Sequence, residues 1–133
     1  MSLHIDQRER EGVVILDLDG RITVGAEAGG LRDKIAELDA AGTRNIVLNL
    51  SKVDYIDSTG LGALVMAATS MRKHGGNVKL VNLNRRNIEL LVMTKLATIF
   101  ESFTDEQDAV NSYYPDRKVN TFDILSFVFG DLS

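Results

Sequence analysis

Three short runs of β-branched and apolar residues alternate with segments of helical periodicity, and this alternation limits the possible folds more than any other feature of the chain. The runs are Val13–Leu18, Asn45–Leu50 and Val78–Leu83. Between them, apolar residues recur every three or four positions over 28–38 and 61–71. Parallel strands need crossover connections, which helices supply, so the pattern predicts an α/β domain with a partly parallel sheet covered by helices.

The first residues add a strand that pairs antiparallel with the next one. Leu3–Ile5 alternates apolar and polar residues, and Glu11-Gly12 separates it from Val13–Leu18. A short turn between two such segments predicts a hairpin, which makes the central sheet mixed. The chain has 133 residues without a repeat, linker or low-complexity tract, so we expect a single domain.

Weaker patterns complete the order of elements. Ile88–Val92 has apolar residues on one helical face, Ile99-Phe100 is apolar enough for a short strand, and Asp105–Tyr113 resembles a last helix. Gly29 and Gly30 lie within the first helical segment, and each costs about 1 kcal/mol relative to alanine. We therefore expect that helix to begin late or to fray.

Composition excludes several kinds of function. The chain has no cysteine, which excludes disulfides, thiol nucleophiles and cysteine-ligated metals. Its 15 Lys and Arg residues against 19 Asp and Glu residues give a net charge of −4, which argues against a nucleic-acid partner. No apolar run approaches the ~18 residues that span a bilayer, and the polar start lacks a secretory signal. We expect a cytoplasmic protein that does not bind a membrane.

The motifs typical of catalytic and cofactor sites are incomplete. The Gly-Leu-Gly at 60–62 begins a dinucleotide-binding pattern, but Val65 occupies the third glycine position. No serine lies in a nucleophile elbow, and His74 beside a helix-ending Gly-Gly is assigned a capping role. Asp17 and Asp19 could hold Mg²⁺, but their spacing also places both on the polar face of a half-buried hairpin, which we favour. We expect no metal, no cofactor and no catalysis.

The segment 53–62, VDYIDSTGLG, joins a buried strand to a helix. Sites in α/β domains gather at the carboxyl ends of strands. Asp57 and Ser58 are both strong N-cap residues, so one of them is expected to accept a hydrogen bond from the first helical turn. Gly60 and Gly62 are costly in that turn. They leave the helix start bare of side chains, so another surface can approach its backbone.

A serine hydroxyl at such a helix start suits phosphorylation. The helix dipole and free N–H groups stabilise a phosphate at this end of a helix. The phosphate adds about −1.5 to −2 charges to a surface that a partner must touch. Phosphorylation of Ser58 is therefore predicted to switch binding while the domain stays folded.

Three segments carry a resemblance to a known family: VDYIDSTGLGALV, with VVILDLDGRI upstream and GGNVKLVNL downstream. Together they resemble the STAS domain of bacterial anti-sigma factor antagonists. The resemblance implies a STAS domain over residues 1–115, with a mixed sheet and packed helices, followed by a tail at 116–133. It also implies a binding protein. The unphosphorylated form binds an anti-sigma factor that is a GHKL-type serine kinase, phosphorylation releases it, and a PP2C-type phosphatase restores binding.

Matched residue by residue, the resemblance implies that Ser58 is the phosphorylated serine. It also implies partner contacts in the turn after the second strand and at the helix start. The residues are Asp19, Gly20, Arg21, Asp57, Ser58, Thr59, Gly60, Leu61 and Gly62. An acidic residue often follows that turn in the family, whereas this chain has Thr23. A partner contact made by that acid is therefore not carried over.

The tail at 116–133 extends past the end of the family domain. Its apolar residues recur at spacings of three and four, which predicts an amphipathic helix. They are Phe122, Leu125, Phe129 and Leu132, with Phe127 and Val128 widening the face. We favour a helix folded back on its own domain or swapped onto a second copy to form a homodimer, with a partner-binding arm as the alternative. Only Arg117 and Lys118 are basic, which argues against a membrane anchor.

The leading hypothesis is a non-enzymatic anti-sigma factor antagonist controlled by phosphorylation of Ser58. Two alternatives belong to other classes. A constitutive STAS adaptor, such as the small subunit of a lipid-transport ATPase, would use the same helix surface without phosphorylation. An Mg²⁺-dependent phosphoacceptor at Asp17 and Asp19 is the third hypothesis.

Overall fold

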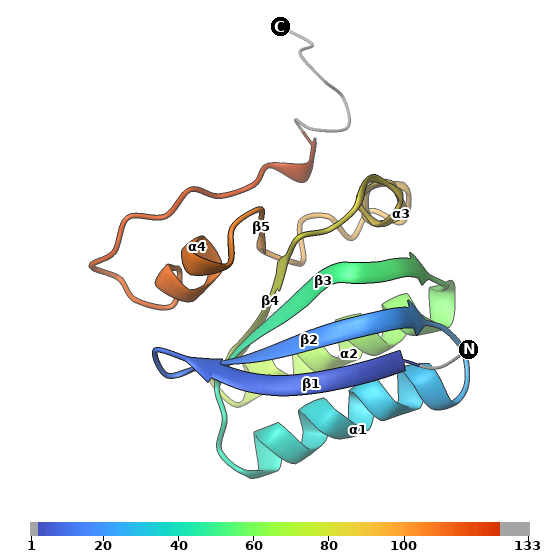
Figure 1. The fold of residues 1–133 in the computed structure, drawn as a ribbon, viewed down its shortest axis with the longest axis horizontal. Coiled ribbons are helices and arrows are strands. Elements are labelled where there is room, and N and C mark those ends of the chain that lie inside the picture. Colours follow the sequence, from blue (N-terminus) through green and yellow to red (C-terminus); the bar gives the residue numbers. More distant parts are fainter. Residues whose placement is uncertain (1–2, 126–133) are drawn as a thin grey trace, which may run out of the picture.

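The computed structural model of this chain describes residues 3–125 and consists of a five-stranded sheet with packed helices (Figure 1). In chain order the elements are β1 (Leu3–Arg10), β2 (Val13–Ile22), α1 (Ala26–Ala40), β3 (Asn45–Ile56), α2 (Ser58–Lys73), β4 (Asn77–Val81), α3 (Arg85–Met93), β5 (Ser102–Phe103) and α4 (Glu106–Asn111). The strands lie in the order β1-β2-β3-β4-β5. β1 runs antiparallel to β2, and the other neighbours are parallel, so the predicted mixed α/β sheet is confirmed.

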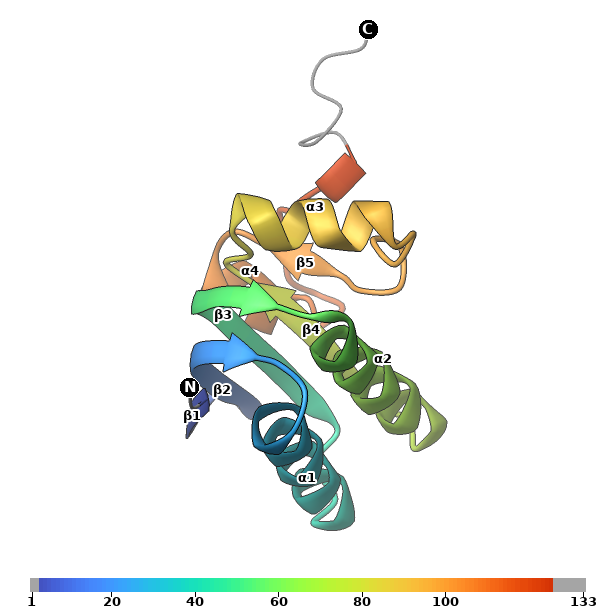
Figure 2. The ribbon, with the colours of Figure 1, turned by 90° about the vertical axis from the view of Figure 1, so that its right-hand side faces the viewer.

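Each face of the sheet has its own apolar core. α1 and α2 pack side by side against one face (Figure 2), where Leu16 of β2 and Leu48 of β3 belong to the larger core. α4 packs on the opposite face, where Ile15 and Val47 belong to a smaller core. Neighbours along a strand point to opposite faces, so the β-branched runs supply both cores. Burial on both faces explains why these strands are continuous apolar runs in the sequence.

Local turn chemistry produces the predicted hairpin between β1 and β2. Arg10 of β1 pairs with Val13 of β2. The two residues between them, Glu11 and Gly12, have φ angles of 52° and 85°. Two positive φ angles in a two-residue loop belong to a type I′ turn, whose twist matches that of the paired strands. The turn therefore sets the register of the edge strand.

The first helix differs from the sequence prediction. α1 begins at Ala26 and contains both Gly29 and Gly30. Ala28 and Leu31 on the same turn are buried against the sheet. Packing of an apolar face contributes more to helix stability than intrinsic propensity does. The expectation of a late start was wrong because it weighed the glycines without this burial.

The last strand also lies elsewhere than predicted. β5 is Ser102–Phe103, whereas the sequence pattern placed it at Ile99-Phe100. The Ile99 N–H donates to the Leu96 carbonyl in a turn, and Phe100 is buried in the larger core. These two residues are apolar because they close a turn over the core, not because they pair with a strand.

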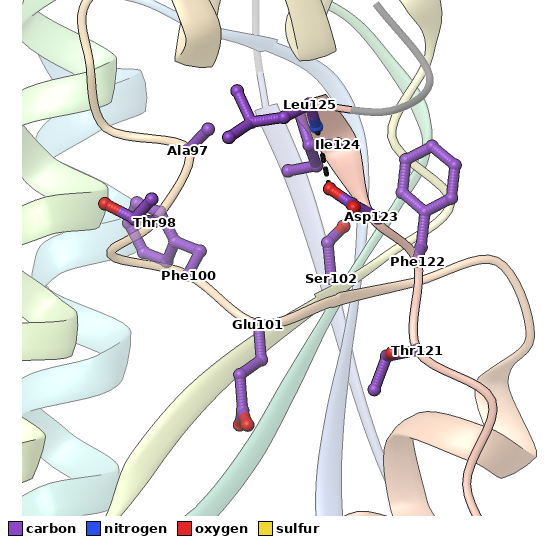
Figure 3. Close-up of a pocket in the computed structure, with 10 residues that line it drawn as sticks. All are labelled: Ala97, Thr98, Phe100, Glu101, Ser102, Thr121, Phe122, Asp123, Ile124 and Leu125. Carbon is purple, nitrogen blue, oxygen red and sulfur yellow. Dashed lines mark hydrogen bonds between the residues drawn. The ribbon is translucent and has the colours of Figure 1, made fainter. Parts of the chain in front are cut away.

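The described part of the tail lies on its own domain. The Phe122 N–H donates to the carbonyl of Ser102 at 3.1 Å, which covers part of the β5 edge. Ile124 is only 4% exposed and belongs to the larger core. Figure 3 shows these tail residues opposite 97–102, around a hollow of about 190 Å³. Burial of Ile124 therefore anchors the tail to the domain that precedes it.

The helix expected in the tail begins at the end of the described residues. Residues 116–123 form no helix, and 124–125 are helical. The other predicted apolar positions lie outside the described residues: Phe127, Val128, Phe129 and Leu132. Over 3–125, no helix is both long and apolar enough to cross a bilayer.

Candidate functional site

The ends of β2 and β3 bring two distant turns together. The strands are parallel, and Ile22 pairs with Ile56 at their ends. Each strand then leads into a helix, so the segment 23–25 before α1 lies beside Asp57 before α2. The predicted site around Ser58 therefore lies at the carboxyl edge of the sheet, where α1 and α2 begin (Figure 1).

Asp57 connects these two turns. Its Oδ1 accepts a hydrogen bond from the Gly60 N–H at 2.7 Å, which caps α2. Its Oδ2 accepts from the Val24 N–H at 2.9 Å, and its own N–H donates to the Ile22 carbonyl at 3.2 Å. The hydrogen bonds from Gly60 and Val24 lower the pKa of the Asp57 carboxyl. Of the two cap candidates, Asp57 is the one that caps the helix.

Asp57→Ala is expected to lower the midpoint of thermal unfolding by about 3–6 °C at pH 7, since it removes a helix cap and the bond to Val24. Because the folded pKa of Asp57 is lowered, its stabilising effect is complete above about pH 4, the ordinary Asp value. The effect is lost as the pH falls through the folded pKa. Calorimetry from pH 7 to pH 2 measures both changes.

Asp57→Asn is the control, because it keeps one acceptor oxygen. Its unfolding midpoint should lie between those of wild type and Asp57→Ala. Equal midpoints for wild type and Asp57→Ala at pH 7 would contradict the capping role of Asp57.

Gly60 and Gly62 have different surroundings although both lie in the first turn of α2. Gly60 is buried, and a Cβ atom built on it would overlap the carbonyl oxygen of Ile22 and lie 2.7 Å from the carbonyl carbon. Gly62 is exposed, and a Cβ atom there would meet nothing within 4 Å. Gly60 is therefore required by the close approach of α2 to β2, whereas the fold places no such demand on Gly62.

Ser58 presents its hydroxyl to solvent at the start of α2. The side chain is exposed, and among residues 3–125 it has no hydrogen-bond partner. Thr59 is exposed beside it, whereas Leu61 is only 3% exposed and belongs to the larger core. The predicted site residues thus divide into an exposed set, which a partner can reach, and a buried set, which holds the helix start in place.

The three residues expected in a turn after the second strand instead lie within β2, because that strand continues to Ile22 in pairing with β3, and one of them reaches this edge. Arg21 pairs in register with Tyr55, and its guanidinium lies 5.9 Å from the centre of the Tyr55 ring. Asp19 instead lines a separate hollow with Lys52. Gly20 has a φ of 127° at an irregularity in the pairing of β2 with β3. Of these three residues, Arg21 is therefore the one that lies beside the end of β3.

A groove of about 270 Å³, which we call the α2–α3 groove, lies beside Ser58. Residues from the end of β3, the start of α2 and the length of α3 line it. They are Tyr55, Ile56, Asp57, Ser58, Arg86, Asn87, Glu89, Leu90 and Met93. Sequence reasoning missed the α3 residues, because nothing in the order of elements places that helix beside α2. Met93 is 81% exposed, which is unusual for a large apolar side chain.

Two asparagines fasten α3 to the sheet and so determine the wall of this groove. Asn84 caps α3 by accepting from the Asn87 N–H at 2.8 Å. The side-chain amides of Asn84 and Asn87 each donate to the carbonyl of Val53 at 3.0 Å. Asn87 is only 1% exposed, so these bonds are shielded from water. The position of α3 relative to β3 is therefore well determined.

A model of the STAS domain family matches residues 4–109, which is most of the chain. The chain belongs to the STAS domain family. An anti-sigma-B factor antagonist of Bacillus subtilis is 35% identical over 101 residues, which cover 76% of this chain and 91% of that protein. The anti-sigma-F factor antagonist RsfB of Mycobacterium tuberculosis is 30% identical over 121 residues, covering 87% and 96%.

A solved structure shows the same fold. The crystal structure of a candidate anti-sigma factor antagonist from Thermotoga maritima superposes with a TM-score of 0.74 at 26% sequence identity. The match covers 81% of this chain and 92% of that one. The STAS-like fold expected from the three sequence segments is therefore confirmed over most of the domain. These relatives are named as regulators, not as enzymes.

Asp17 of β2 has a structural role in this STAS domain. Asp17 accepts hydrogen bonds from the Arg8 Nε at 2.6 Å and from the Asn49 side-chain amide at 2.8 Å. These bonds, chiefly those from Arg8, lower the pKa of Asp17. Asp17 thus joins β1, β2 and β3 on the face of the sheet that carries the smaller core, which agrees with the structural role that the sequence favoured over Mg²⁺ binding. Within residues 3–125, no three His, Asp or Glu side chains gather where they could hold a metal.

Proposed function

We propose that this protein is an anti-sigma factor antagonist whose binding is switched by phosphorylation of Ser58. The observation that carries the proposal is the exposed, unbonded Ser58 hydroxyl at the capped start of α2. It occurs in a chain that is 35% identical to an anti-sigma-B factor antagonist over most of both proteins. We propose that the partner is an anti-sigma factor with GHKL-type serine kinase activity, and that a PP2C-type phosphatase reverses the modification in the cytoplasm.

The surface around Ser58 supports binding of a protein partner. Ser58, Gly62 and Met66 follow at intervals of four residues, so they lie on one face of α2, and all three are exposed. We call this row the docking stripe. Met66 is 58% exposed, and Val24, bonded through its N–H to Asp57, is 67% exposed. Exposed apolar side chains beside a bare glycine provide contact area that the isolated domain leaves uncovered.

The location of Ser58 explains how a phosphate would change binding without unfolding the domain. The hydroxyl is exposed, so a kinase reaches it with the fold intact. The positive end of α2 tolerates negative charge at this position. At pH 7 the phosphate adds about −1.5 to −2 charges at the end of the docking stripe. Binding of a partner there would remove water from the charged phosphate, which is unfavourable. We therefore infer that the unphosphorylated form is the binding form.

Phosphate mapping tests the proposal. The protein is incubated with ATP and a candidate anti-sigma factor kinase from the same organism, and the modified residue is identified by mass spectrometry. We expect one phosphate on Ser58, none on Ser58→Ala, and an unchanged yield for Ser51→Ala, the matched control with an exposed hydroxyl on β3. Absence of phosphate on Ser58, together with partner binding that Ser58→Asp does not weaken, would overturn the proposal and favour a constitutive adaptor.

A further inference from the structure

Two arginines stack on one tyrosine beside the proposed phosphorylation site. The guanidinium of Arg86, on α3, lies 4.8 Å from the centre of the Tyr55 ring, and that of Arg21, on β2, lies 5.9 Å from it. Both distances are within the range of cation–π attraction. Both arginines are exposed, and neither forms an ion pair with a carboxylate among residues 3–125. Stacking holds each guanidinium in place while leaving its N–H groups available to an anion.

The carboxylates near these arginines form no ion pair with them among the residues that the structure describes. Glu89, which also lines the α2–α3 groove, pairs with Arg85 at 3.1 Å. Asp57 uses its oxygens to accept the N–H groups of α2 and of the preceding turn. Asp54 lines a hollow with both arginines but forms no ion pair with Arg86 or Arg21 within the described chain. Arginines and carboxylates balance in number at this end of the sheet, so what it offers an anion is the N–H groups of Arg21 and Arg86 that no carboxylate of the described chain pairs with.

The α2–α3 groove brings one of these arginines and the phosphorylation site together. Arg86 from α3 and Ser58 from α2 line the same groove of about 270 Å³. The Asn84 and Asn87 bonds to the Val53 carbonyl hold α3, and hence Arg86, against the end of β3. Guanidinium groups bind phosphate oxygens through two parallel hydrogen bonds, which makes arginine well suited to this ligand.

We propose that Arg86 binds the phosphate of phosphorylated Ser58 inside the α2–α3 groove, while Arg21 adds positive charge from its place on the same tyrosine. This inference rests on the proposed function, since it concerns the phosphorylated state of that site. A phosphate on Ser58 lies next to the ionised Asp57, and a nearby cation offsets the repulsion between the two anions. Phosphorylation then fills the groove and neutralises Arg86 in one step, so neither the groove nor this guanidinium is available to a partner.

Phosphorus NMR on protein with phosphoserine installed at position 58 during synthesis tests the inference without a kinase. The second pKa of a free phosphoserine is about 6. We expect it to be lower in the folded protein, and Arg86→Gln to raise it by about half a unit, the size of a well-formed exposed ion pair. The matched control is Lys95→Gln, which removes the same charge just beyond the end of α3, from an exposed side chain outside the groove. It should change the value by less than about 0.2 unit. Arg21→Gln should raise it less than Arg86→Gln does.

The outcomes separate the two proposals. A larger shift for Arg86→Gln than for Lys95→Gln supports a direct contact. Equal shifts for the two variants would indicate only the general field of the protein and would overturn the inference, as would an unshifted phosphoserine in wild type. Neither result bears on whether a kinase modifies Ser58, which the mass-spectrometric mapping decides. Circular dichroism of each variant shows whether α3 remains folded.

Discussion

Gly60→Ala is expected to destabilise the domain by about 3 kcal/mol or more. The added Cβ atom would overlap the carbonyl oxygen of Ile22, which is backbone and cannot rotate away. Relief requires α2 to move away from β2, and that would break the Asp57 N–H bond to the same carbonyl and open the larger core beneath Leu61. Inserting atoms into a packed site commonly destabilises a protein by about 1–3 kcal/mol. Because the obstacle here is backbone, which cannot move aside, we expect a loss at about the upper limit or beyond it.

Urea unfolding followed by circular dichroism measures this effect. Domains of this kind have about 5–15 kcal/mol of stability in total, so the loss should be large enough to reduce soluble yield as well. Gly62→Ala is the matched control, because its Cβ atom would lie in open space. It should leave stability unchanged or raise it slightly, since alanine is the better helix former. A Gly60→Ala midpoint within error of that of Gly62→Ala would show that the helix is not held as close to β2 as the structure indicates.

Gly62→Gln is expected to weaken binding of the anti-sigma factor at least tenfold while the domain stays fully folded. Gly62 lies in the middle of the docking stripe, between Ser58 and Met66, and its bare backbone lets a partner approach closely. A long side chain there holds the partner away from the apolar surface of Met66. A tenfold loss corresponds to about 1.4 kcal/mol, a modest fraction of what a central contact contributes.

Calorimetric titration with the purified anti-sigma factor measures the dissociation constant. Ala40→Gln is the control, because it places the same side chain on an exposed position at the far end of α1. It should bind as wild type does. If Gly62→Gln keeps wild-type affinity and wild-type stability, the partner does not dock on this face of α2, and the glycine has no role in binding.

The Asp57 cap and the close approach of Gly60 to β2 show which details of the site the sequence could not predict. Asp57 and Ser58 were equal candidates for the cap, because both residue types accept hydrogen bonds from a first turn. The choice depends on Val24, which lies 33 residues away in the chain and donates to the second Asp57 oxygen. Likewise, Gly60 and Gly62 look alike in the sequence, and only the position of β2 separates a required glycine from a dispensable one.

Local contacts explain what the sequence predicted well. The Glu11-Gly12 turn, the alternation of strands and helices, and a cap at the start of α2 depend on residues close together in the chain, whose preferences act wherever they occur. The strand expected at Ile99-Phe100 was misplaced for the opposite reason. Whether an apolar pair forms a strand or closes a turn over a core depends on the neighbours that the fold provides.

The sequence by itself determined the class of fold, the family resemblance and the segment that contains Ser58, because periodicity and turn residues act over a few positions. Only the tertiary structure decided which residues share the site. The parallel register of β2 and β3 sets Arg21 beside Tyr55, and the asparagine bonds of α3 to Val53 bring Arg86 into the groove that Ser58 lines. These residues come together because separate elements pack at one edge of the sheet. Their spacing along the sequence does not predict this proximity.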